Sequence, residues 1–280
     1  MQRAKAWLHI VLPWPMVAWC ERLYFAQFGE IELCMVKHLC RPDQDSIDVG
    51  ANVGTYLHAM MRHSDRVYAF EPIPWLAQLL PKKFGRKVVV ENLALSHETS
   101  RALLHIPVVD GTPVTGLSTL SDDLAAKTAL YRDIPVETRP LDEVYSGNVG
   151  FIKIDVEGHE HNVLRGARRT IERCRPRVLI EAEERHAPGS VRRIQAFFRR
   201  FGYRGYFVFQ RQLAPIECFD PARMQRSEDI ADYTLGMPRA QFEHYINNFL
   251  FLPREEPSTT LAQLEEALTK RAGPAGGGNQ

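Results

Sequence analysis

The segment Ser46-Ile-Asp-Val-Gly-Ala-Asn-Val-Gly-Thr55 decides the fold. It predicts a short buried strand, a tight turn that contains glycine, and the start of a helix. That order brings backbone N–H groups and a helix N-terminus close to a bound ligand. A second apolar strand, Val67–Phe70, is followed by Glu71, about 20 residues beyond the loop. A glycine loop followed by an acid at this distance indicates a nucleoside-binding site.

The composition of the loop distinguishes between nucleoside cofactors. A dinucleotide site requires G-x-G-x-x-G, whereas here Asn52 stands between Gly50 and Gly54. Asn tolerates a left-handed backbone better than most residues and can replace a glycine in a turn. Asp48, at the end of the strand, would repel a pyrophosphate but suits a cation. The loop therefore favours S-adenosylmethionine, which carries a sulfonium and an ammonium and has no phosphate.

Other polar residues follow the predicted strands and are expected at the same edge of the sheet. Glu71 is the candidate for the two ribose hydroxyls, since one carboxylate can accept from both. Asn92 follows a third strand and can pair with the adenine edge, with an ordinary turn residue as the alternative.

The segment Phe151-Ile-Lys-Ile-Asp-Val-Glu-Gly-His-Glu160 is the second informative stretch. It brings Lys153 and Asp155 to the sheet edge, and Glu157 and His159 to the start of a helix. One interpretation is a general base that deprotonates a hydroxyl. A divalent-metal cluster is the other, with Glu181 or Glu183 as an additional ligand. Glu160 is also explained as a helix-capping acid.

Composition limits the class of protein. The chain has 280 residues, 45% hydrophobic and 25% charged, which suits one globular domain with appendages. A net charge of +1 argues against a strongly basic nucleic-acid surface. The five cysteines are odd in number and include no C-x-x-C pair, which indicates reduced thiols in a cytoplasmic protein.

The N-terminal stretch from Ala6 to Cys20 is apolar and aromatic, with Arg3 and Lys5 before it. It contains two prolines and is too short for a membrane span of about 20 residues. We expect an appendage that packs on the domain or on a partner. Contact with a membrane surface through its tryptophans, Trp7, Trp14 and Trp19, is the less favoured alternative.

Strands and helices alternate along the chain, which predicts a doubly wound α/β sheet. Expected strands span 47–49, 66–70, 87–91 (Val-rich, as in a central parallel strand), 102–108, 134–139, 149–155, 177–182 and 203–210. Expected helices span 28–39, 53–62, 75–84, 159–173, 191–201 and 261–270. The polar insertion from Asp110 to Asp133 is expected to form a substrate lid. For His186 a surface position is favoured, with the crevice as the alternative.

Several segments together resemble the FkbM-type methyltransferase family. The matching segments are Ile47-Asp-Val-Gly-Ala-Asn-Val-Gly54, Phe70-Glu-Pro72, Asn92-Leu-Ala-Leu95, Leu141-Asp142, Ile152-Lys-Ile-Asp-Val-Glu-Gly-His-Glu160 and Leu179-Ile-Glu181. Weaker matches continue to Gly202-Tyr203 and Asn248-Phe-Leu-Phe-Leu-Pro253. The resemblance covers roughly 28–253, and its two long motifs make it specific.

The resemblance implies a class I methyltransferase (Rossmann-like) fold, a mostly parallel sheet of seven strands whose last strand is antiparallel. It implies S-adenosylmethionine-dependent O-methylation of a hydroxyl on a small or sugar-containing molecule. Implied cofactor contacts are Asp48, Gly50, Ala51, Asn52, Gly54, Glu71 and Asn92, and the implied catalytic face holds Lys153, Asp155, Glu157 and His159.

Three parts are expected: an apolar appendage over 1–27, a methyltransferase domain over 28–253, and a polar, partly disordered tail over 254–280. Metal dependence and oligomeric state stay open. The alternatives are a nicotinamide-dependent oxidoreductase and a non-catalytic protein that binds a cofactor or a partner.

Overall fold

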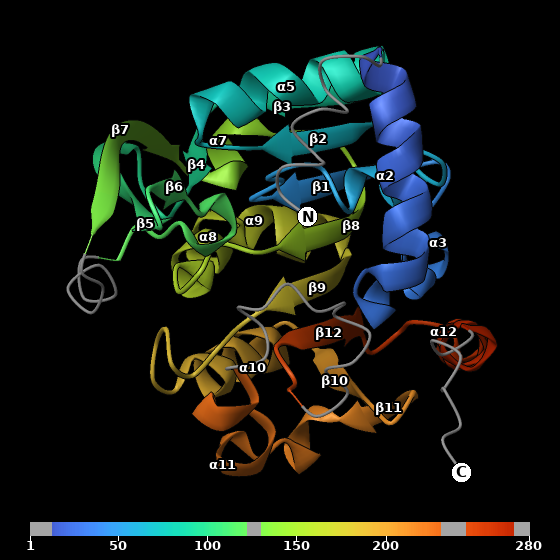
Figure 1. Ribbon diagram of the computed structural model, residues 1–280. Coiled ribbons are helices and arrows are strands. Elements are labelled where there is room, and N and C mark those ends of the chain that lie inside the picture. Colours follow the sequence, from blue (N-terminus) through green and yellow to red (C-terminus); the bar gives the residue numbers. More distant parts are fainter. Residues whose placement is uncertain (1–12, 122–129, 231–244, 272–280) are drawn as a thin grey trace, which may run out of the picture.

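Two sheets and the helices around them make up the protein (Figure 1). The structure, a computed structural model, describes residues 13–121, 130–230 and 245–271. The main sheet contains β1 (Asp45–Val49), β2 (Val67–Phe70), β3 (Val88–Glu91), β8 (Val149–Ile154), β9 (Arg177–Glu181), β10 (Tyr203–Phe209), β11 (Gln212–Pro215) and β12 (Asn248–Pro253). The small sheet contains β4 (Ala94–Leu95), β5 (Ser100–Val109), β6 (Thr112–Pro113) and β7 (Tyr131–Arg139).

The helices lie between and around these strands. The α-helices are α2 (Trp14–Phe28), α3 (Val36–Leu39), α4 (Leu57–Met60), α5 (Pro74–Phe84), α7 (Leu141–Val144), α8 (Glu160–Gly166), α9 (Arg168–Cys174), α10 (Ser190–Arg200), α11 (Pro221–Met224) and α12 (Ser258–Lys270). Single 3-10 turns span Ile31–Met35, Gly85–Lys87, Thr115–Leu117, Ile216–Cys218 and Ser227–Ile230.

The main sheet runs in the order β3-β2-β1-β8-β9-β12-β10-β11. Strands β3, β2, β1, β8 and β9 are parallel, and β12 is antiparallel to both of its neighbours, β9 and β10. The order reverses between β1 and β8, and ligands bind at such a switch point in open α/β sheets. The mostly parallel, doubly wound sheet predicted from the sequence is therefore confirmed, and it defines a class I methyltransferase-like fold.

Successive side chains of a strand point to opposite faces of the sheet, so the main sheet packs into two separate cores. Ile152 and Ile154 of β8 point into the layer of α8, α9 and α10, whereas Phe151 points into the layer of α3, α4 and α12. On β9, Val178 and Leu179 divide in the same way. Both faces of the sheet are covered, which explains why these strands are apolar throughout.

Two details of the expected sheet are wrong. The Val-rich strand β3 lies at the edge of the sheet and not at its centre, because the chain leaves it for the small sheet. The main sheet has eight strands where seven were expected. The additional strand is β11, which follows β10 through a tight turn and pairs with it as a hairpin. Apolar content alone does not distinguish an edge strand from a central one.

Three expected helices are shorter than the sequence suggested. The helix expected over 28–39 is a 3-10 segment, Ile31–Met35, followed by the short α3. The helix expected over 53–62 is only α4, because turns occupy the residues between Ala51 and Leu57. The helix expected over 159–173 is divided at Ala167 into α8 and α9. The carboxylate of Asp142 accepts from the backbone N–H groups of Arg169 and Thr170, each at 2.8 Å, and so caps a new helix start.

The insertion between β5 and β7 adds a wall beside the main sheet. β5 and β7 pair antiparallel over most of their length, and the segment between them contains β6 and the turn Thr115–Leu117. Residues 122–129 of the expected lid lie outside the described residues, as do Trp7 and the glycine-rich end of the tail. The described part of the insertion reaches the main cavity.

Helix α2 packs along the side of the main sheet against α5 (Figure 1). The carboxylate of Glu21 on α2 pairs with the ammonium of Lys83 on α5 at 2.5 Å. Among the described residues, no helix has both the length and the hydropathy needed to cross a bilayer.

The close contact between α8 and the small sheet predicts a sensitive position at Gly166. A Cβ there would lie 1.9 Å from the carbonyl oxygen of Ser96. Helix propensity alone would make Gly166→Ala stabilising by up to about 1 kcal/mol. Because backbone atoms must move apart, we expect instead a loss of about 2 kcal/mol in the free energy of unfolding, measured by denaturant titration. Arg165→Ala, at an exposed neighbour, should change it by less than about 0.5 kcal/mol, and equal effects would contradict the explanation.

Candidate active site

A cavity of about 310 Å³ opens at the carboxyl ends of β1, β2 and β8. The loop after β1 forms its floor, and the segment 71–73 after β2 forms one side. Aromatic residues of α2 and the turn 115–120 of the insertion form the other walls. The cavity thus lies at the switch point of the sheet, where the strand order predicts a ligand site.

The loop after β1 has the backbone form that its sequence predicted. Gly50 has a φ of +80°, and a Cβ there would lie 1.9 Å from the carbonyl oxygen of Asp155. Asn52 also has a positive φ, 47°, in place of the glycine of a dinucleotide loop. Gly50 therefore lets the loop pass directly over the end of β8.

Glu71 is buried in the wall of the cavity and holds the loop in place. Its Oε2 accepts from the backbone N–H of Asn52 at 2.6 Å, and its Oε1 accepts from that of Ile73 at 2.8 Å. Burial raises the pKa of this carboxyl to about 7, although the two backbone hydrogen bonds oppose the change. Each carboxylate oxygen can accept more than one hydrogen bond, so capacity remains for a ligand.

Two of the expected cofactor contacts do not line the cavity. The amide of Asn92 is exposed and donates to the carbonyl oxygens of Glu71 and Pro72, at 2.9 and 3.0 Å. At Gly54, an added Cβ would lie 2.5 Å from the ring of Phe84. Asn92 thus orders the chain after β2 and Gly54 lets the loop pack on α5. The expected residues that do line it are Asp48, Gly50, Ala51, Asn52, Glu71, Lys153, Asp155, Glu157 and His159.

Lys153 is completely buried at the end of β8, among carboxyl groups. Its Nζ lies 3.9 Å from Asp155 Oδ2 and 3.8 Å from Glu181 Oε2. Burial alone would lower the pKa of Lys153, but the surrounding carboxylates raise it above its ordinary value. Burial raises the pKa of nearby Asp48 to about 7, and the Lys153 charge opposes that change. Lys153 is therefore a buried countercharge beneath the cavity.

His159 lines the cavity, and neighbouring side chains contact both of its ring nitrogens. Nε2 lies 2.9 Å from Ser96 Oγ, and Nδ1 lies 3.3 Å from the amide of Asn162. Burial and the nearby His97 lower its pKa to about 4, so the ring is neutral at pH 7. An imidazole engaged on both sides is poorly placed to accept a further proton.

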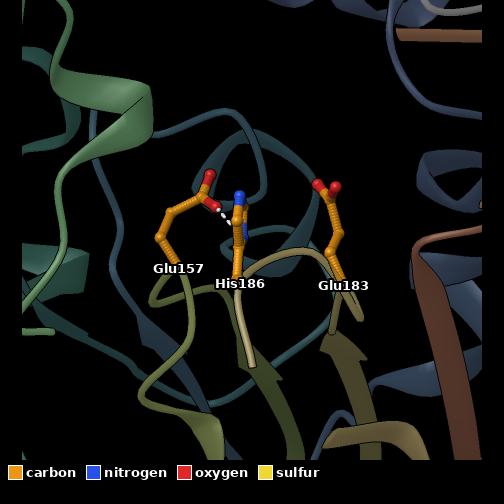
Figure 2. A group of neighbouring side chains, drawn as sticks. All are labelled: Glu157, Glu183 and His186. Atoms are coloured by element: carbon orange, nitrogen blue, oxygen red, sulfur yellow. Dashed lines mark ion pairs between the residues drawn. The ribbon is translucent and has the colours of Figure 1, made fainter. Parts of the chain in front are cut away.

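Two glutamates and a histidine, Glu157, Glu183 and His186, form a cluster beside the cavity, in the loops after β8 and β9 (Figure 2). His186 Nδ1 lies 2.9 Å from Glu157 Oε2, and Glu183 stands on the other side of the imidazole. The His186 side chain is only 12% exposed, so the surface position favoured from the sequence is wrong. Its partner comes from a different strand end, which sequence spacing does not reveal.

These three side chains are close enough to hold a metal ion, as are Asp155, Glu157 and Glu181. The Arg185 guanidinium and the Tyr245 hydroxyl both donate hydrogen bonds to the Glu183 carboxylate. Burial alone would lower the pKa of His186, and the Glu157 carboxylate more than offsets this, so the pKa is raised. When protonated, the His186 imidazole places a positive charge between the two glutamates.

The aromatic wall of the cavity was not predicted from the sequence. Tyr24, Phe25 and Phe28 of α2 line the cavity, although residues 1–27 were assigned to an appendage. Glu30 follows, and its carboxylate accepts from the Tyr56 hydroxyl at 2.6 Å. The closely spaced aromatic residues of α2 were the available signal, but they do not indicate which strand ends the helix faces.

The family of the chain follows from comparison with known proteins. The family model described as "Methyltransferase FkbM domain" matches residues 48–204, which is more than half of the chain. That range contains both long motifs and most of the residues that line the cavity. The chain therefore belongs to the FkbM methyltransferase family, and its main sheet has the class I methyltransferase fold.

Solved structures that the chain matches include methyltransferase FkbM from Methylobacillus flagellatus KT, with 16% identity and a TM-score of 0.48. That match covers 75% of this chain and 44% of the other, so this chain spans less than half of that protein's length. An rRNA methylase from Streptococcus thermophilus has 12% identity and a TM-score of 0.41, over 79% of this chain and 92% of the other. Comparison with curated proteins finds no match.

The two histidines of the site should have pKa values on opposite sides of the ordinary value. In an NMR titration of the ring signals we expect a pKa of about 4 for His159 and one above 6.5 for His186. Glu157→Gln should lower the value for His186 and leave that of His159 unchanged. The contribution of the His186 ion pair to stability is lost as the pH rises through the raised folded-state pKa of His186. Because burial raises the pKa of Glu157 as well, the ion pair also weakens at acid pH, when that carboxyl is protonated. A His186 pKa that does not respond to Glu157→Gln would contradict the ion pair.

Proposed function

We propose that this protein is an S-adenosylmethionine-dependent methyltransferase that methylates a hydroxyl oxygen of a small molecule. The observation that carries the proposal is Glu71, a buried carboxylate in the cavity wall that stands beside the loop after β1. Family membership supports methyl transfer, and the cavity chemistry supports the choice of cofactor and acceptor.

The residues around the cavity suit this cofactor. Glu71 has acceptor capacity for ribose hydroxyls, and the backbone from Gly50 to Asn52 lies open to the cavity. Asp48 and Asp155 place carboxyl groups where a sulfonium and an ammonium are favoured. The bound cofactor supplies an electrophilic methyl carbon attached to a positively charged sulfur.

The same features disfavour a dinucleotide. Carboxyl groups of Asp48, Glu71 and Asp155 line the cavity and, in their ionised forms, would repel a pyrophosphate. The helix after the loop, α4, is a single turn that begins only at Leu57, so it offers little dipole for a phosphate. These observations support S-adenosylmethionine over a nicotinamide cofactor.

Asp155 is the residue that we place at the acceptor oxygen. Its side chain is partly exposed, lies in the cavity wall and has the Lys153 ammonium 3.9 Å away. A carboxylate at this position can accept the proton that leaves a hydroxyl. Orientation of the two reactants by the cavity accounts for most of the expected rate enhancement.

The acceptor is expected to be a compact molecule with both apolar and hydroxyl groups. Phe25 and Phe28 line one side of the cavity, and Thr115 and Ser118 line another. An apolar face with a few polar groups is the usual composition of a small-molecule site.

Calorimetry with S-adenosylmethionine and NADH tests the cofactor. We expect S-adenosylmethionine to bind the wild-type protein, and Glu71→Gln to weaken binding by tenfold or more, about 1.5 to 3 kcal/mol for hydrogen bonds to a charged group. Glu91→Gln is the matched control, because Glu91 ends the adjacent strand but is exposed and does not line the cavity. Binding of NADH without S-adenosylmethionine would refute the proposal.

Transfer of a labelled methyl group to a pool of hydroxylated small molecules tests the base. Asp155→Asn should reduce turnover by about 10²- to 10⁴-fold, because general-base catalysis contributes this much, while cofactor binding is retained. Asp65→Asn is the control, since Asp65 is exposed at the opposite end of β2. Unchanged turnover in Asp155→Asn would exclude Asp155 as the base.

A further inference from the structure

The outward face of α2 is apolar and exposed. Met16, Trp19 and Leu23 are 52%, 56% and 47% exposed. Their spacing of three and four residues places them on one side of the helix, over a length of about 10 Å. Val17 and Ala18, on the inward side, are buried. The helix is therefore apolar on both sides, although its inward side alone packs against the protein.

Charge on and before this helix indicates what covers the exposed face. Arg3 and Lys5 precede the helix, Arg22 lies within it, and the first acidic residue of the chain is Glu21. The charge of Glu21 is compensated from within the protein, at 2.5 Å from Lys83. The N-terminal region thus combines an exposed apolar stripe with a net positive charge. A second copy would bring like charges together, whereas an anionic lipid surface is complementary to both properties.

We propose that Met16, Trp19 and Leu23 form a docking face that seats α2 on an anionic lipid bilayer. Trp is favoured at the boundary between headgroups and acyl chains, and basic residues are attracted to anionic headgroups. A helix of 15 residues lies in the interface and does not cross the bilayer.

The docking face is continuous with the cavity. One residue beyond Leu23, Tyr24 lines the cavity, and Phe25 and Phe28 follow on the same helix. Docking would place the cavity mouth at the lipid surface, where it takes hydroxylated amphiphiles as acceptors. This consequence rests on the proposed methyltransferase function, whereas binding to lipid does not.

Co-sedimentation of the full chain with lipid vesicles tests the docking face. We expect binding to vesicles of phosphatidylcholine with phosphatidylglycerol, and weaker binding to phosphatidylcholine alone. The pair Trp19→Glu with Leu23→Glu should reduce the partition coefficient by about tenfold or more, since two apolar side chains no longer enter the interface. Leu103→Glu is the matched control, because Leu103 is 51% exposed on β5, away from α2. It should leave binding unchanged.

Two further measurements separate the possible outcomes. Calorimetry with S-adenosylmethionine, run on every variant, shows whether the fold and cavity are intact, and the milder pair Trp19→Ser with Leu23→Ser should lower vesicle binding in the same direction. Light scattering reports whether the stripe joins two copies. The proposal is overturned by absence of vesicle binding, by an equal loss in Leu103→Glu, or by a dimer that the stripe variant dissociates. Vesicle binding without cofactor binding would contradict the proposed function and support the docking face.

Discussion

The site depends on one buried charge, the ammonium of Lys153. It lies without solvent exposure at the end of β8, close to Asp155 and Glu181 and within the field of Asp48 and Glu30. Several buried carboxylates so near each other would repel strongly without a cation among them. The Lys153 charge lets the ends of β1, β8 and β9 come together, and the cavity forms above it. The Lys153 ammonium, a group of the protein itself, thus stabilises the acidic side chains that suit a cationic ligand.

The local parts of this arrangement were predictable from sequence. The loop from Gly50 to Asn52 and the acid Glu71 depend on neighbouring residues: an apolar strand, a turn with positive φ and a second strand. Parallel β strands put their carboxyl ends at the same edge, so the meeting of Asp48, Glu71 and Asp155 also followed from the pattern. Lys153 was correctly placed at this edge, although its complete burial was not foreseen.

Contacts between distant segments were not predictable in the same way. Asn92 was expected at the ligand, but its amide donates to carbonyl groups after β2. His186 was expected at the surface, but it pairs with Glu157 from the preceding βα loop. In each case the deciding partner lies far along the chain or on another strand end. The residue type limits the hydrogen bonds and ion pairs that a side chain can form. The packing of distant segments determines which of them it does form.

The sequence by itself determined the alternation of strands and helices, the turn at Gly50 and the acid series, because these depend on local periodicity and backbone preference. Only the tertiary structure decided that α2 is a wall of the cavity and that its outer side, at Met16 and Trp19, stays exposed. The reason is physical: an apolar helix has no periodic polar face to orient it. Its contact with α5, through Glu21 and Lys83, selects which side is buried.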